Sequence, residues 1–389
     1  MNKTPYYSWK LNNLAKGCKQ CVLGRKLVVF VTGICPRNCF YCPLSEQKKN
    51  IDVIFANERE LKDENDTSAI IEEAKACKSL GAGFTGGDPL ARIERTCRYI
   101  KLLKKEFGKK FHIHLYTSLD LLNSKSLKML DDAGLDELRL HPDFTSDRLW
   151  KNFGLLFDAK NNKKYSFDIG VEIPSIPGFE VQTMKLIDYF IPRIDFLNIN
   201  ELEISDTNSC ELVDRHFVTK DKTSYGVEGS QELALKLLSH YEKKYPESNI
   251  HYCTCKLKDG VQLRERLKLR ANNTKKIFDI VSEDGTIIRG VIYLHTLKPE
   301  FGYKTILKNI LPMERIRLLK ELSDARTNLI NDYGIPKNML EVDEKKLRII
   351  TNIGVVKKLF KRLHSKGLVP AIVEQYPTWD QMEVDVEFL

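Results

Sequence analysis

The chain has 389 residues and a formal net charge of +9, and 42% of its residues are hydrophobic while 30% are charged. This length exceeds the size at which one hydrophobic core usually stops growing, so we expect more than one folding unit. The sequence has no run of 18 apolar residues and no apolar signal region near its N-terminus, which argues against a membrane protein and predicts a cytoplasmic one.

Residues 1–24 form an N-terminal lead with a C-x2-C pair, Cys18 and Cys21, which is half of a possible metal site. The apolar run at 26–32 predicts a strand buried on both faces. Further strand patterns follow at 82–85, 110–116, 135–141, 165–174, 194–204 and, more briefly, 249–253. Helical patterns separate them at 66–80, 90–107, 122–133, 181–190 and 231–244. This alternation predicts parallel strands, in either an open doubly wound sheet or a barrel.

The pattern changes after Cys255, so we expect a domain over 25–255 and a separate α+β domain over 256–389. The latter shows a basic helix or helical turn at 258–273, a hairpin around Gly285, an amphipathic helix at 313–331, one or two helices within 340–366, and strands at 368–374 and 382–388. It holds 25 Lys and Arg against 18 Asp and Glu. That excess is compatible with a nucleic-acid partner, although a solvated basic face is the plainer interpretation.

Three cysteines, Cys35, Cys39 and Cys42, lie on one short loop directly after the first apolar strand. A [4Fe–4S] cluster is normally held by four thiolates, so a loop with three leaves one iron open to another ligand. The C-x3-C-x2-C spacing also differs from the C-x2-C pairs of structural zinc sites. The plainer alternatives are a partial zinc site or scattered buried thiols.

This loop, with Tyr41 before its last cysteine, resembles the CxxxCxφC signature of the radical S-adenosylmethionine (SAM) superfamily, and within it proteins related to the activating enzyme of pyruvate formate-lyase. The resemblance covers roughly residues 25–205 and implies a partial (β/α)6 radical SAM barrel. It also implies that Cys35, Cys39 and Cys42 hold a [4Fe–4S] cluster whose fourth iron chelates SAM. One-electron transfer would then split SAM to a 5′-deoxyadenosyl radical that abstracts hydrogen from the substrate.

The resemblance extends to the SAM-binding residues. Gly86, Gly87, Asp88 and Pro89 follow the second strand where the family has its GGE motif, with Asp in place of Glu, and Tyr41 is expected near the adenine. Polar residues at later strand ends could face the barrel mouth and contact SAM or substrate: Ser118, Arg139, Glu172, Asn198 and Asn200.

A second site is suggested by the sequence His251-Tyr-Cys253-Thr-Cys255 together with Cys18 and Cys21. Four thiolates would suit an auxiliary [4Fe–4S] cluster or zinc, while His251 in place of one Cys would favour zinc. Unrelated buried thiols are the equally weighted alternative.

We therefore expect a radical SAM enzyme, an iron-dependent oxidoreductase supplied with electrons by a low-potential donor such as ferredoxin. Its substrate is open: tRNA, a protein glycyl site or a small molecule. The alternative is an iron–sulfur or zinc scaffold that binds nucleic acid without SAM chemistry.

Overall fold

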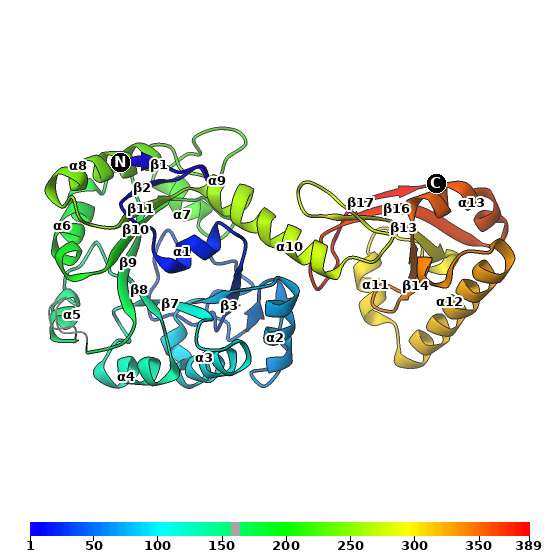
Figure 1. Ribbon diagram of the computed structural model, residues 1–389. Coiled ribbons are helices and arrows are strands. Elements are labelled where there is room, and N and C mark those ends of the chain that lie inside the picture. The colour runs from blue at the N-terminus through cyan, green and yellow to red at the C-terminus, as the bar shows by residue number, and fades with distance from the viewer. Residues whose placement is uncertain (157–163) are drawn as a thin grey trace. The chain divides into compact units, whose positions relative to one another are not determined.

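The computed structural model describes residues 1–156 and 164–389, in two compact units, Met1–Arg266 and Leu267–Leu389 (Figure 1). Within these described residues, no helix is both long and apolar enough to cross a membrane.

The first unit is built on seven parallel strands that hydrogen-bond to one another in chain order. They are β3 (Lys26–Phe30), β6 (Gly81–Thr85), β7 (His112–Ser118), β8 (Glu137–His141), β9 (Asp168–Ser175), β10 (Phe196–Glu201) and β11 (Ile250–Cys253). Antiparallel pairs extend both edges, with β4 (Phe55–Ala56) and β5 (Arg59–Glu60) beyond β3, and β2 (Trp9–Leu11) and β1 (Asn2–Lys3) beyond β11. In the strand order of the described residues β1 and β5 are the two unpaired ends, so the sheet is an open, partial barrel. The predicted (β/α)6 barrel is confirmed, with β11 as a seventh parallel strand.

Helices cover the outer face of this sheet, because alternate strand residues such as Leu27, Val29 and Ile113 are apolar and fully buried against them. Local signals fix the helix ends. Asn123 and Ser126 form a reciprocal capping box at the start of α4, and Gly134 ends this helix in the left-handed conformation. The covering elements are α2 (Thr67–Ala76), η1 (Pro89–Arg92), α3 (Ile93–Phe107), α4 (Ser124–Ala133), α5 (Trp150–Leu156), α6 (Glu180–Phe190), η2 (Ile191–Arg193), α7 (Ser209–Asp214) and α8 (Ser230–Lys244).

Two short segments occupy the concave side of the sheet. In α1 (Lys16–Cys21) the backbone N–H of Gly17 donates to Glu137 Oε2 at 3.1 Å, and a Cβ at this glycine would overlap the His114 ring. At the other edge, β11 leads into α9 (Cys255–Leu257), the π-helical turn η3 (Lys258–Leu263) and α10 (Arg264–Thr274). A Cβ at Gly24 would overlap the backbone of Arg266, so this segment reaches from the end of β11 to the loop before β3. It therefore runs between the two edges of the parallel sheet.

The second unit is an antiparallel sheet with helices, as the α+β prediction has it. Its strand order is β14 (Leu340–Asp343), β15 (Arg348–Thr351), β13 (Ile287–Leu294), β16 (Leu368–Gln375) and β17 (Glu383–Phe388), with β12 (Ile280–Val281) paired to β13 in the predicted hairpin. The remaining elements are η4 (His295–Leu297), α11 (Tyr303–Asn309), α12 (Pro312–Tyr333), η5 (Lys337–Met339) and α13 (Ile353–Ser365).

Of the one or two helices predicted within 340–366 the structure has one, α13, and it adds two strands that the sequence analysis did not predict. The stretch forms the β14–β15 hairpin before the single helix α13, because Val342, Ile349 and Ile350 are β-branched residues that pack well in a sheet.

Candidate active site

The loop with Cys35, Cys39 and Cys42 leaves β3 at the carboxyl end of the parallel sheet, and all three thiols are partly exposed. Its backbone is fixed by the returning segment, since Gly33 N–H donates to Ile51 O and Asn50 N–H donates to Gly33 O, both at 2.9 Å. A Cβ at Gly33 would overlap the Lys48 carbonyl, so glycine alone fits there. The start of the loop is therefore fixed against the segment that returns from it, and the three cysteines follow on the same loop.

The GGDP turn after β6 is hydrogen-bonded to this loop. The N–H of Gly87 donates to Thr32 O and that of Asp88 donates to Ile34 O, both at 2.8 Å. Gly86 has φ +145°, and a Cβ there would overlap the Thr32 carbonyl. Both glycines are needed for two backbones to pack this closely.

Asp88 is fully buried, and its carboxylate is an acceptor for four donors. Thr117 Oγ1 and Ser118 Oγ donate at 2.8 Å, and the N–H groups of Leu90 and Ser118 donate at 3.0 Å. Burial raises the pKa of Asp88 above its ordinary value despite these bonds. The side chain thus joins the GGDP turn to the end of β7, and Pro89 begins η1 beside it.

These loops surround a cavity of about 310 Å³ at the carboxyl ends of the strands. Of the residues predicted from the sequence it is lined by Cys35, Cys39, Cys42, Tyr41, Gly86, Gly87, Ser118, Glu172 and Asn200. The cavity thus brings most of the predicted SAM-binding residues together.

Tyr41 is fixed by His141 from β8, a partner that spacing cannot indicate. Its hydroxyl donates to His141 Nε2 at 2.7 Å, and His141 Nδ1 donates to the Glu172 carbonyl at 2.8 Å. Burial lowers the pKa of His141 to about 4, so the ring is neutral and can accept from Tyr41 at pH 7.

Glu172 on β9 is the polar centre of the site. It accepts from Arg139 at 2.7 Å and from the amides of Asn198 and Asn200 at 2.9 Å. Burial alone would raise the pKa of Glu172, but Arg139 and the two amides outweigh it and hold the pKa below its ordinary value. Arg139 and Asn198 lie deeper than Glu172, where both also donate to Cys18 Sγ.

A second cavity of about 380 Å³ lies deeper and adjoins the first, with which it shares the lining residues Thr85, Tyr116, Glu172, Asn200 and Lys258. It reaches Cys21 of α1 and residues of η3. Lys26 and His114, which contact each other, also line it, and burial lowers the pKa of Lys26 to about 8. The sequence analysis missed Lys26, His114 and Lys258 because each looks like an ordinary polar residue beside an apolar strand or in a basic helix.

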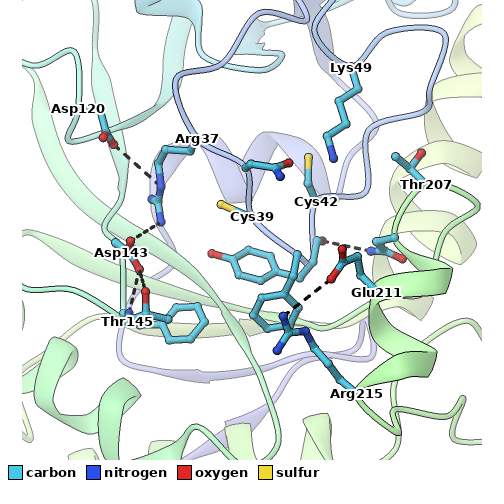
Figure 2. A pocket seen from close by; sticks show the side chains of 15 residues that line it. Arg37, Cys39, Cys42, Lys49, Asp120, Asp143, Thr145, Thr207, Glu211 and Arg215 are labelled. Atoms are coloured by element: carbon cyan, nitrogen blue, oxygen red, sulfur yellow. Dashed lines mark hydrogen bonds and ion pairs between the residues drawn. The ribbon is translucent and has the colours of Figure 1, made fainter.

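The outer side of the cysteine loop forms a groove of about 510 Å³ (Figure 2). Figure 2 shows Arg37 directed toward Asp120 and Asp143, with ion pairs of 3.9 and 3.5 Å. The amide of Asn208 donates to Tyr41 O at 3.1 Å, so the residue just before α7 also holds the loop.

The remaining predicted ligands divide into two places. Four of them lie on the concave side of the sheet: Cys18, Cys21, His251 and Cys253. Burial raises the pKa of the Cys253 thiol, and the nearby Cys18 and Cys21 raise it further. Cys255 is buried beside Glu201, which accepts its backbone N–H at 2.8 Å. As placed, no three His, Cys, Asp or Glu side chains among the described residues are gathered to hold a metal ion, and this includes Cys35, Cys39 and Cys42.

Comparison with known proteins supplies the family. Residues 29–173 match the model of the Radical SAM superfamily, and residues 285–389 match a domain of unknown function, DUF8061. The chain is 45% identical over 290 residues, 74% of its length, to a protein of Methanocaldococcus jannaschii described as "Putative glycyl-radical enzyme activating enzyme", and covers 76% of that protein. It is 30% identical over 116 residues to PqqA peptide cyclase of Gluconobacter oxydans, which is 29% of either chain.

Two solved structures are similar at low identity. Methylornithine synthase (PylB) has 13% identity and a TM-score of 0.36, over 62% of this chain and 72% of that one. The radical SAM methyltransferase TsrM from Kitasatospora setae has 10% identity and a TM-score of 0.34. The match covers 52% of this chain and 41% of the methyltransferase.

Proposed function

The chain belongs to the radical SAM superfamily, and from this premise we propose that it is an activating enzyme that abstracts hydrogen from a glycine of a partner protein. The observation that supports this substrate is the 45% identity over most of both chains to the Methanocaldococcus jannaschii protein described as an activating enzyme. An iron–sulfur or zinc scaffold without SAM chemistry gains no support from these matches.

The residues present fit the cofactors that the family implies. Three partly exposed thiols stand on one loop, and the paired glycines of the GGDP turn leave backbone atoms open to the same cavity. We propose Cys35, Cys39 and Cys42 as the ligands of a [4Fe–4S] cluster, and Gly86, Gly87 and their neighbours in the turn as contacts of the SAM amino group. When bound, the cluster and SAM together supply a 5′-deoxyadenosyl radical after one-electron reduction.

The side chains of the chain itself bind SAM and orient it. Ser118, Glu172 and Asn200 line the cavity and offer hydroxyl, carboxylate and amide groups to the ribose or to the methionine part of SAM. Tyr41, held by His141 and packed 5.7 Å from the Phe144 ring centroid, offers a rigid surface for the adenine. Arg139 and Asn198 keep Glu172 ionised and in place, so we assign them a positioning role.

The deeper cavity provides a place for the reacting glycine. It adjoins the first cavity and is lined in part by α1 and η3, which cover the concave side of the sheet there. Excluding water protects a reactive radical from side reactions. A low-potential donor such as ferredoxin, in the cytoplasm, would supply the electron.

The test of the SAM reaction is anaerobic reconstitution with iron and sulfide, then dithionite and SAM, with 5′-deoxyadenosine measured by chromatography. We expect 5′-deoxyadenosine from the wild type and none above background from Cys35→Ala. Equal amounts from both would contradict the assignment of the cluster loop.

The test of the substrate is co-expression with a glycyl-radical enzyme from the same genome, with the glycyl radical detected by electron paramagnetic resonance. The signal should require this chain and disappear when the glycine of the partner is changed to alanine. If 5′-deoxyadenosine forms while no glycyl-radical enzyme gains a signal, the protein substrate is wrong and the SAM chemistry stands.

tRNA is the second candidate substrate, favoured by the excess of Lys and Arg over Asp and Glu in residues 256–389. Binding to tRNA that weakens steeply between low and moderate salt would support it. The second set of cysteines, Cys18, Cys21, Cys253 and Cys255, is not part of either proposal.

A further inference from the structure

Two cysteines of α1 face the concave side of the sheet. Cys18 and Cys21 are three residues apart, so they lie on one face of this helix. The start of α1 is fixed by the hydrogen bond from Gly17 to Glu137, and Cys18 Sγ accepts from Asn198 Nδ2 at 3.3 Å. Cys18 therefore lies beside β10, and Cys21 lines the deeper cavity with Lys26 of β3, both near enough to influence the thiol of Cys253.

Strand β11 directs two more ligand-type side chains to the same place. His251 and Cys253 alternate with Tyr252, so they share one face of the strand, and they pair in register with Asn198 and Asn200 of β10. Both asparagines donate to Glu172 on the concave side. Cys253 also packs in one apolar cluster with Val22, the residue after Cys21. Chain segments more than 200 residues apart thus meet around three thiols and one imidazole.

The His251 ring is buried, at 3% exposed, and its two nitrogens have no hydrogen-bond partner among the described residues. Asn198 Oδ1, on the residue paired with His251, is also buried without a partner. A metal on one ring nitrogen would satisfy it and would let the other ring N–H donate to Asn198 Oδ1, the kind of outer hydrogen bond that metal-bound histidines make.

Cys18 already has the surroundings of a ligating sulfur. Arg139 and Asn198 donate to its Sγ at 3.4 and 3.3 Å, and Arg139 is itself held by Glu137 at 2.5 Å and Glu172 at 2.7 Å. N–H donors toward sulfur stabilise a thiolate and hold it in one orientation. By contrast, Cys255 is beside Glu201, whose carboxylate accepts its backbone N–H.

We propose that Cys18, Cys21, Cys253 and His251 bind a second, thiophilic metal centre, a zinc ion or an iron–sulfur cluster, that fastens α1 to the end of β11. Three thiolates and one imidazole are a donor set that zinc takes, and histidine also replaces cysteine on some cluster irons. Side-chain rearrangement must accompany binding, because no three such groups among the described residues are gathered to hold an ion. Four protein ligands leave no open position, so the role is structural. This proposal replaces Cys255 of the sequence-based set by His251.

The test uses the full chain with Cys35, Cys39 and Cys42 all changed to Ala, purified anaerobically without chelators. Zinc, iron and acid-labile sulfide are measured per chain. About one zinc without sulfide identifies the ion, and iron with sulfide identifies the cluster; either result supports the site. Absence of both metals overturns it.

Single substitutions in that background locate the ligands. Cys18→Ala, Cys21→Ala, Cys253→Ala and His251→Ala should each reduce the retained metal at least fivefold, while the matched controls Cys255→Ala and Cys97→Ala should keep it. His251→Cys should restore what His251→Ala loses, which separates ligation from packing even if the alanine variant is unstable. Loss of metal in Cys255→Ala equal to that in Cys253→Ala would overturn the assignment of His251.

Discussion

Changing Asp88 to Asn tests whether this buried carboxylate holds the SAM-binding turn against β7. The carboxylate accepts from two hydroxyls and from the backbone N–H groups of Leu90 and Ser118. An asparagine keeps one oxygen and replaces the other by an NH2 donor. The hydroxyls can rotate to accept from the new amide, but a backbone N–H cannot, so one buried N–H loses its acceptor.

The expected cost is the desolvation of that N–H plus the loss of charge assistance in the bonds that remain, about 2–4 kcal/mol together. For a folding unit of this size such a cost lowers the melting temperature by roughly 5–15 °C. The displaced glycine turn should also slow 5′-deoxyadenosine formation, by roughly tenfold or more, since tenfold corresponds to about 1.4 kcal/mol.

The assay must report on the first unit alone. The chain has three tryptophans, Trp9 and Trp150 in the first unit and Trp379 in the second. In a Trp379→Phe background, intrinsic fluorescence therefore follows the unfolding of the first unit. Asp132→Asn, which removes only an exposed ion pair with Lys128, is the matched control and should shift the melting temperature by less than about 2 °C. A melting temperature for Asp88→Asn as close to wild type as that of the control, with unchanged 5′-deoxyadenosine formation, would refute the reasoning.

Three further substitutions have defined outcomes. Gly86→Ala places a Cβ against the Thr32 carbonyl and should abolish 5′-deoxyadenosine formation. Gly108→Ala is the control, because its Cβ meets nothing within 4 Å, and it should retain the activity. Equal activity of the two variants would contradict the close packing of the two loops. Tyr41→Phe removes the donor to the buried His141 ring and should destabilise the first unit by about 1–2 kcal/mol in urea unfolding, against no change for the exposed Tyr7→Phe. Burial lowers the pKa of Lys26 from 10.5 to about 8 in the folded chain. Between pH 8 and 10.5 the unfolded chain therefore binds more protons than the folded chain. The free energy of unfolding should rise with pH over this range, by up to about 3 kcal/mol in total. Lys26→Met should remove that rise in urea midpoints measured from pH 7.5 to 10.5, and an unchanged slope would show that the lysine is not buried.

The parts of the site that follow from sequence are those encoded within a few residues. Cys35, Cys39 and Cys42 fall on one turn, and Gly86 and Gly87 are adjacent, so their spacing survives any arrangement of the rest of the chain. The parallel strands were also predictable, because their outer faces are apolar and helices alternate with them. Even β11, four residues long, falls within the short strand expected at 249–253.

The rest of the site depends on which strands become neighbours. The contact between Tyr41 and His141 joins residues 100 positions apart, and the one between Cys18 and Asn198 joins residues 180 apart. The sequence around one residue of such a pair does not indicate which residue it will contact. Cys253 and Cys255 show the same limit on a smaller scale, because their separation by two residues predicts a shared face only while the strand continues, and β11 ends at Cys253.

The metal proposed at α1 bears directly on the radical chemistry. Cys21 lines the deeper cavity, which adjoins the cavity at the cluster loop. Burial raises the pKa of Cys21 to about 11, so without a metal this group is a protonated thiol at neutral pH. A thiol S–H bond is weaker than the primary C–H bond of 5′-deoxyadenosine, so a thiol in the cavity wall can give its hydrogen to the 5′-deoxyadenosyl radical. A thiolate bound to a metal has no such hydrogen to give. Ligation of Cys21 would therefore remove one competing hydrogen donor from the cavity wall, as well as fastening the N-terminal helix in place.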